Sequence, residues 1–171
     1  VTRSKKVKEK IDQLKNFSII NQSEVNGYGL NGKMNEFQAA LGLLQLKYFA
    51  KVIKVRKKNY NIYKSELSNY DQLRFIEFDD SIKYNYAYCP LFFDVKNNVR
   101  DKIFDKLNSN NIFLRKYWSP LITDHSQYNK YTSSGFPIAK KLSQTVLCLP
   151  IYYDLKVKVI EKILNIIRSE L

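Results

Sequence analysis

The sequence predicts a mixed α+β fold in which helices pack on one face of a small sheet. From residue 70 onward, apolar periodicity indicates the order strand, strand, helix, strand, helix, strand, helix. A hydrophobic share of 44% and an aromatic share of 14% indicate a folded chain with a core. The 171 residues suffice for one domain, or for a small domain joined to part of another.

The first third of the chain is expected to be helical at both ends. Residues 4–16 read as a short helix with Ser4 as its N-cap. Residues 17–33 lose periodicity and contain three glycines, which predicts a loop. A long helix follows to Leu67, and two apolar stripes in its first half predict enclosure on several sides. We expect a domain boundary inside this helix, between residues 1–45 and 46–171.

The remaining elements are shorter. We expect strands over residues 73–78, 84–93, 112–117 and 146–149, and helices over 98–109, 137–143 and 155–168. Pro90 favours an edge position or a bulge for the second of these strands. Pro137 fits the first position of a helix. Residues 118–136 are expected to be irregular.

The net charge of +13 raises the possibility of an anionic partner. The lysines are scattered among acids along the chain, and the richest run, 51–58, lies on a helix. We therefore interpret the charge chiefly as a solvated face, with an anionic small molecule and nucleic acid as the alternatives. No run approaches the roughly 18 unbroken apolar residues of a membrane span, and no signal peptide is visible. A chain without an initiator Met suggests truncation or processing.

Few residues offer independent chemistry. Cys89 and Cys148 lie in apolar runs and are expected to be buried thiols in a reducing cytoplasm. One histidine and two distant cysteines supply no metal-ligand spacing, so no metal site is expected. His125, the only imidazole, lies in an irregular stretch, where an exposed loop residue and a substrate contact are both open readings.

The segment from Gly27 to Lys33 is an anion-binding candidate. Its glycines allow the backbone to approach a ligand closely. Asn31 and Lys33 place an amide and a cation at the start of the long helix, where backbone N–H groups favour a phosphate. A purely structural loop that caps the helix is the alternative.

The same segment resembles a known family. The pattern Gly-x-Asn-x-[Arg/Lys]-Met-x-[Glu/Asp]-x-Gln-Ala-Ala-x-Gly-x-x-Gln-Leu is matched in register from Gly29 to Leu46. Further along, Arg56, Tyr63, residues 112–120 and the run Val146–Pro150 match later signatures. The chain thus resembles, over nearly its whole length, the DegT/DnrJ/StrS sugar-nucleotide aminotransferases.

The resemblance implies a fold-type I transferase that depends on pyridoxal 5'-phosphate. Residues 46–171 would form its small C-terminal α+β domain, and residues 1–45 a remnant of the large cofactor domain. The family forms homodimers in which the Asn31–Lys33 loop would contact the partner subunit's cofactor phosphate. Glutamate donates an amino group to a nucleotide-linked keto-deoxysugar, here of the dTDP-4-keto-6-deoxyglucose type. The residues implied to contact substrate are Tyr28, Arg115, Tyr117 and His125.

The resemblance also implies what this chain lacks. The Schiff-base lysine of the family would precede Val1, so no catalytic residue is expected here, and the chain alone is expected to be inactive and poorly soluble. In many relatives the histidine follows the Pro-Leu pair directly, whereas His125 is three residues further on. The parent is expected to be cytoplasmic and to serve polysaccharide or lipopolysaccharide synthesis, without a membrane or nucleic-acid partner. A dehydratase of the same family and a basic nucleic-acid-binding domain are the alternatives.

Overall fold

The computed structural model describes residues 2–94, 98–131 and 135–171, and the chain divides into two compact units, Val1–Tyr48 and Phe49–Leu171. Helix α2, Glu36–Leu67, contributes to both units. The expected domain boundary between residues 45 and 46 stays a prediction. The assignment of the first unit to a larger cofactor domain stays a prediction.

The first unit begins with helix α1, Lys5–Leu14, which is N-capped by Ser4 as predicted. The Ser4 hydroxyl accepts a hydrogen bond from Val7 N at 3.4 Å. The expected loop over residues 17–33 was incompletely predicted, because it contains an antiparallel hairpin of β1, Ile19–Asn21, and β2, Glu24–Val25. The β-branched residues of this hairpin favour extended backbone. The glycines that follow them led instead to the prediction of a loop.

Helix α2 begins with a reciprocal cap. Gln38 N donates to Asn35 Oδ1 at 2.8 Å, and Asn35 N donates to Gln38 Oε1 at 3.2 Å. The expectation that its first half is enclosed is wrong for this chain, since Phe37 is 80% exposed and Leu46 is 72% exposed. Among the described residues of the first unit, Ser18 alone is buried. The apolar stripes of this half find nothing within the first unit to pack against.

The second unit contains a three-stranded antiparallel sheet of order β3-β4-β5. The strands are β3, Leu73–Phe75, β4, Pro90–Phe93, and β5, Val146–Cys148. The edge position inferred from Pro90 is wrong, because β4 is the central strand. Pro90 is tolerated there because it is the first residue of the strand.

Three of the four expected strands are shorter in the structure, and the fourth is reduced to one bridge. Residues 84–89 form no strand, and Tyr86 has a φ of 49°, which interrupts a regular strand. Their aromatic rings instead pack on one another and on α2: Phe78 stacks on Tyr84 at 4.0 Å, and Tyr86 meets Tyr60 edge-on at 5.5 Å. The expected strand over residues 112–117 is reduced to a single bridge between Arg115 and Cys148.

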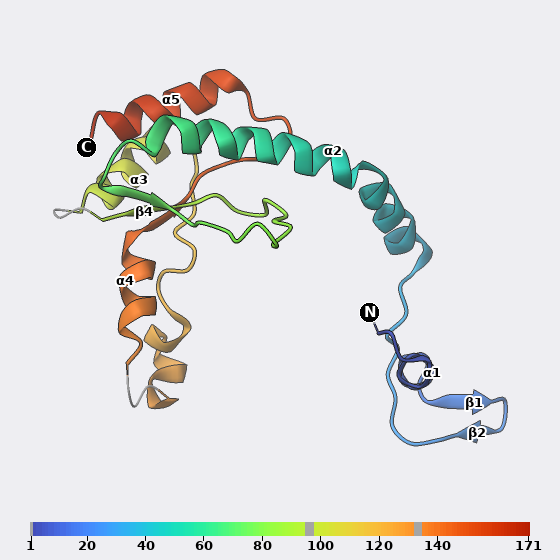
Figure 1. Ribbon diagram of the computed structural model, residues 1–171. Helices are drawn as coiled ribbons and strands as arrows, with labels where there is room; N and C mark the ends of the chain where they lie inside the picture. Colours follow the sequence, from blue (N-terminus) through green and yellow to red (C-terminus); the bar gives the residue numbers. More distant parts are fainter. Residues whose placement is uncertain (1, 95–97, 132–134) are drawn as a thin grey trace. The chain divides into compact units, whose positions relative to one another are not determined.

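Four helices pack around the sheet: α2, α3 (Val99–Ser109), α4 (Pro137–Thr145) and α5 (Val157–Arg168). Figure 1 shows α5 and the C-terminal half of α2 above β4, and α4 below it. Short 3-10 turns, Ile122–Asp124 and Ser126–Tyr131, occupy the expected irregular stretch, of which residues 132–134 lie outside the described part.

The core lies between the sheet and the helices α2, α3 and α5. Its fully buried members come from every one of these elements: Tyr63, Leu67, Leu91, Ile103, Leu107, Leu147, Ile160, Ile163 and Ile167. The strand register places Phe92 and Val146 on the opposite face, and both are buried as well. Helices on one face alone, as predicted, would leave these two residues exposed. The prediction was therefore incomplete.

Candidate functional site

The residues expected to contact the substrate or the cofactor fall in three places. Arg115 and Tyr117 line one pocket of the second unit, and His125 lines another. Asn31 and Lys33 lie in the first unit, together with Tyr28, whose side chain is fully exposed. The structure therefore brings Arg115 and Tyr117 together.

The first pocket, which we call the arginine pocket, has a volume of about 180 Å³. Its side chains come from α2, from the segment before β4, from residues 113–117 and from the chain after β5. The residues that give it polar character are Arg56, Tyr88, Arg115, Tyr117, Cys148 and Tyr152. Arg56 was matched to the family pattern by sequence but was not predicted as a site residue. Tyr88 and Tyr152 were missed, because neither follows a motif.

Backbone hydrogen bonds to β5 hold the arginine pocket together. Cys148 N donates to Arg115 O at 2.8 Å, and Leu149 N donates to Cys89 O at 2.9 Å. Segment 115–117 therefore lies beside β5 although only one residue pair is bridged. Burial raises the pKa of the Cys148 thiol, so it lines the pocket as a neutral group.

Positive charge in the arginine pocket is not neutralised within the described part of the chain. The arginines that form salt bridges there are Arg74, Arg100 and Arg168. Arg56 and Arg115 form none of these, so two guanidinium groups line one small pocket without a carboxylate partner. Guanidinium groups bind carboxylates and phosphates in a planar, bidentate manner, so this pocket is a candidate anion site.

Lys116 connects the segment that carries Arg115 and Tyr117 to α3. Its Nζ lies 2.5 Å from Asp101 Oδ1 and 4.0 Å from the centre of the Phe104 ring, both on α3. Burial raises the pKa of Asp101, but the hydrogen bond from Lys116 and the charge of Arg100 outweigh it and hold that pKa below its usual value. This ion pair connects the segment that carries Arg115 and Tyr117 to α3.

The second pocket, which we call the tryptophan pocket, has a volume of about 580 Å³. Its lining is almost wholly apolar, with two polar side chains, Thr123 and His125. The lining residues are Trp118, Pro120, Leu121, Ile122, Thr123, His125, Phe136 and Ala139. Trp118 stacks on Tyr117 with ring centres 4.3 Å apart, and Tyr117 meets Tyr88 edge-on at 5.4 Å.

In the first unit, the loop before α2 lies tightly along residues 14–18. Leu30 N donates to Leu14 O at 2.9 Å, and the Ser18 hydroxyl donates to Tyr28 O at 2.9 Å. A Cβ on Gly29 would lie 2.3 Å from Ser18 N, so only glycine fits this approach.

Lys33 is held at the end of this loop by uncharged groups. Its Nζ donates to Asn16 Oδ1 at 2.7 Å and lies 5.6 Å from the centre of the Phe17 ring. Among the described residues it forms no salt bridge, and Asn31 beside it is bridged to Asn16 through the backbone. These residues fit the phosphate of pyridoxal phosphate, because an exposed cation and an amide stand together with no acid to compete.

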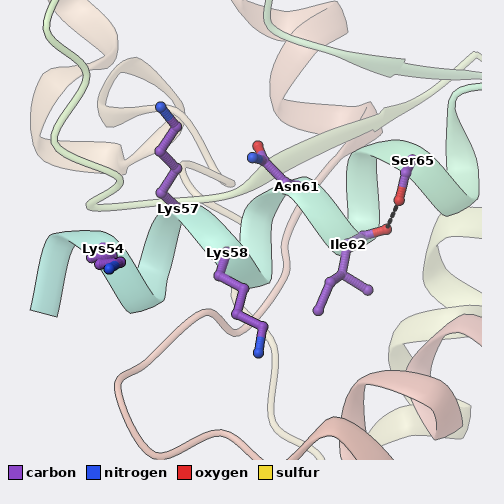
Figure 2. A pocket seen from close by; sticks show the side chains of 6 residues that line it. All are labelled: Lys54, Lys57, Lys58, Asn61, Ile62 and Ser65. Carbon is purple, nitrogen blue, oxygen red and sulfur yellow. Dashed lines mark hydrogen bonds between the residues drawn. The ribbon is translucent and has the colours of Figure 1, made fainter.

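A third hollow lies on the basic face of α2, within the run that raised the nucleic-acid alternative. It is lined by Lys54, Lys57, Lys58, Asn61, Ile62 and Ser65. Figure 2 shows that Lys57 and Lys58 point away from each other, and that the Ser65 hydroxyl is bonded to Ile62 O. Cations that diverge do not form an anion pocket, so this surface is read as a solvated helix face.

The model of the DegT/DnrJ/EryC1/StrS aminotransferase family matches residues 1–168. The chain belongs to this family. A dTDP-4-amino-4,6-dideoxy-D-glucose transaminase of Escherichia coli is 36% identical over 170 residues, which are 97% of this chain and 46% of that enzyme. The corresponding enzyme of Shigella dysenteriae is 34% identical over 99% of this chain and 47% of its own length.

Solved structures show the same fold. Helicobacter pylori PseC, an aminotransferase involved in the biosynthesis of pseudoaminic acid, has a TM-score of 0.87 at 20% identity, over 99% of this chain and 47% of its own. DesI, solved in the presence of its TDP-sugar product, has a TM-score of 0.85 at 24% identity, over 99% of this chain and 44% of its own. The expected family and a mixed helix and sheet fold are thus confirmed. The chain spans less than half the length of the curated relatives it matches.

Among the described residues, no helix is long and apolar enough to cross a membrane. Within the same residues, no cluster of three or more His, Cys, Asp or Glu could hold a metal ion.

Proposed function

We propose that this chain serves a pyridoxal-phosphate-dependent aminotransferase that moves an amino group from glutamate to a dTDP-linked 4-keto-6-deoxysugar. Family membership and the printed activity of the two relatives above 30% identity support the reaction class and the dTDP sugar. The observation that carries the proposal is the arginine pocket, where Arg56 and Arg115 stand without an acidic partner. A nucleotide sugar carries a diphosphate, and this pocket offers it two guanidinium groups.

The chain's own residues bind and orient in this scheme. Arg56 and Arg115 hold the diphosphate, and the hydroxyls of Tyr88 and Tyr117 donate to its oxygens or to the sugar. The cofactor, when bound, supplies the electron sink for the transfer. Asn31 and Lys33 bind its phosphate in the partner subunit of a homodimer, and Tyr28 and His125 contact the substrate. The catalytic lysine belongs to the part of the relatives' length that this chain does not match.

A chimera tests the reaction. The matching C-terminal part of the Escherichia coli relative is replaced by this chain, and transfer of the amino group from glutamate to dTDP-4-keto-6-deoxyglucose is measured. We expect turnover by the chimera and none by the 171-residue chain alone. A chimera that folds and binds pyridoxal phosphate but leaves this sugar unaminated contradicts the proposal, and dehydration of the sugar would favour the dehydratase alternative.

The same chimera tests the role of Lys33. Loss of one charge-assisted hydrogen bond to a phosphate costs about 1.5–3 kcal/mol, so Lys33→Gln should weaken cofactor binding by about 10- to 100-fold. Lys5→Gln on α1 is the matched control, because Lys5 is exposed and its one ion pair among the described residues is with Glu9 at 3.9 Å. Equal cofactor affinity in the two variants would remove Lys33 from the site.

A further inference from the structure

Asp101 lies behind the arginine pocket without lining it, and the segment that carries Arg115 is attached to it. Arg115 and Tyr117 line the pocket, whereas Lys116 between them does not. The Lys116 side chain instead reaches α3, where its Nζ lies 2.5 Å from Asp101 Oδ1. Alternate side chains of one short segment therefore line the pocket and attach the segment to α3.

The sheet supports this segment at an isolated bridge. Cys148 N donates to Arg115 O at 2.8 Å, and the residues that follow Arg115 belong to no strand. The Arg115 side chain is exposed, so packing does not fix its direction. A guanidinium group on such a segment binds an anion more tightly when its freedom is restricted beforehand, because ordering it on binding costs free energy.

Asp101 is itself held in place. It lies in the first turn of α3, a helix whose inner face belongs to the hydrophobic core. Arg100 Nη2 donates to Asp101 Oδ2 at 3.3 Å, and Arg100 Nη1 donates to Ser143 O of α4 at 3.4 Å. With one oxygen bonded by Arg100 and the other by Lys116, the carboxylate is an oriented acceptor for the segment.

We propose that Asp101 is a positioning residue, which holds Lys116 and thereby directs the Arg115 side chain toward the diphosphate of the nucleotide sugar. This inference rests on the proposed function, which supplies the ligand. Asp101 does not touch the ligand. It restricts the segment in the free protein, so that less free energy is lost in ordering Arg115 when the anion binds.

The negative charge of Asp101 by itself predicts the opposite effect. A carboxylate near an anion site repels the anion, so removal of this charge in Asp101→Asn would strengthen diphosphate binding. A role in folding stability alone would leave the affinity of the folded protein unchanged. Positioning predicts weaker binding. The sign of the change in affinity therefore separates the three roles.

Calorimetry of the 171-residue chain with dTDP measures that sign, at a temperature well below the unfolding of each variant. We expect Asp101→Asn to bind about three- to tenfold more weakly than wild type, and Asp101→Glu to recover part of the loss. Asp105→Asn, at an exposed position of the same helix, should bind as wild type does.

Lys116→Met tests the attachment from its other end and leaves α3 unchanged, so it repeats the test if Asp101→Asn does not fold. The double variant of Asp101→Asn and Lys116→Met should bind no more weakly than Lys116→Met alone, because each change removes the same attachment. Losses that add in full would show that the two side chains act separately, and would overturn the proposal.

Trp118 provides a readout that needs no ligand. It is the only tryptophan of the chain, and its indole stacks on Tyr117 with ring centres 4.3 Å apart. The decay of its fluorescence anisotropy therefore reports motion of the segment on the nanosecond scale. Asp101→Asn and Lys116→Met should each add a fast component that wild type and Asp105→Asn lack.

The failures of the two proposals are distinguishable. If wild type binds dTDP and Asp101→Asn binds it equally or more tightly, the positioning role is overturned and the proposed function stands. An anisotropy decay that is the same in Asp101→Asn as in wild type overturns the role as well. If wild type binds no dTDP, the proposed function itself fails, and the positioning role fails with it because no anion remains to be positioned.

Discussion

At the scale of single residues, Gly29 lies so close to the backbone of residues 14–18 that a larger side chain does not fit. A Cβ there would lie 2.3 Å from Ser18 N and 2.4 Å from Phe17 C, and backbone atoms cannot move aside as a side chain can. We predict that Gly29→Ala destabilises the loop by more than about 2 kcal/mol. Hydrogen exchange of the amides of Phe17 and Leu30 measures the effect.

Gly42→Ala is the matched control for that substitution. Gly42 lies within α2, and nothing lies within 4 Å of the position its Cβ would take. Alanine favours helix over glycine by about 0.5–1 kcal/mol, so this variant should be neutral or more stable. Similar losses of protection in the two variants would contradict the close approach at Gly29.

Tyr63 carries a hydroxyl that the fold buries without a hydrogen-bond partner among the described residues. Burial raises the pKa of Tyr63 far above its usual value, so the hydroxyl stays neutral. Because an unpaired buried hydroxyl costs free energy, Tyr63→Phe should leave the free energy of unfolding unchanged or raise it by about 1 kcal/mol.

Tyr60→Phe supplies the comparison for Tyr63. The Tyr60 hydroxyl donates to Ile76 O at 3.4 Å, a bond whose loss should cost about 0.5–1 kcal/mol. Chemical denaturation of both variants gives the two values. A clear loss of stability in Tyr63→Phe alone would show that its hydroxyl has a partner in solution.

At the scale of elements, the ion pair between Asp101 and Lys116 fastens segment 115–117 to α3. The pKa of Asp101 is lowered in the folded state, so the pair adds stability above the ordinary carboxyl pKa and loses it as the pH falls through the lowered value. The stabilisation by this ion pair is therefore lost at pH values below about 4. Asp101→Asn should lower the unfolding temperature at neutral pH and remove this part of the acid sensitivity.

Asp105→Asn on the same helix is the control, because Asp105 is exposed and has no salt bridge within the described part of the chain. Thermal unfolding at pH 7 and at about pH 3 compares the variants with wild type. Equal unfolding temperatures for Asp101→Asn and Asp105→Asn at both pH values would show that the Asp101–Lys116 ion pair does not stabilise the segment.

The helices were predictable because their signals are local. Ser4 and Pro137 mark helix starts that the structure confirms, and the 3.6-residue period of α2 is long enough to be unambiguous. The strands were predicted less well. Phe78, Tyr84 and Tyr86 have high strand propensity, but their rings pack against one another and against Tyr60 instead of extending the sheet.

The site was predictable only where a motif marked it. Arg115 and Tyr117 belong to a recognisable signature and share a pocket. Tyr88 and Tyr152 enter that pocket from segments far apart in the chain, so no spacing rule could join them. The aromatic wall formed by Tyr117 and Trp118 likewise depends on the orientation of neighbouring rings.

At the scale of the whole molecule, the two units differ in their cores. Every residue of the hydrophobic core cluster lies between Tyr60 and Ile167 in the second unit. In the first unit, Leu43, Leu46 and Val25 remain more than half exposed. We predict that residues 49–171 alone unfold cooperatively, with a midpoint near that of the second unit in the intact chain.

Removal of residues 1–48 should also raise solubility, because it removes more than half of the large apolar side chains that are exposed among the described residues. Near-ultraviolet circular dichroism follows the unfolding, and light scattering follows aggregation. A fragment 49–171 that is unfolded in buffer would show that the first unit contributes to the core.

The claim that the arginine pocket binds a nucleotide diphosphate sugar is tested most directly by calorimetry with dTDP-4-amino-4,6-dideoxy-D-glucose. The intact chain should bind it, and Arg56→Gln and Arg115→Gln should each weaken binding by about tenfold or more, since each removes a charge-assisted contact. Arg74→Gln, on an arginine paired with Asp94 at 3.5 Å outside the pocket, should bind as wild type does. Equal affinity in all four proteins, or no binding by wild type, would contradict the account.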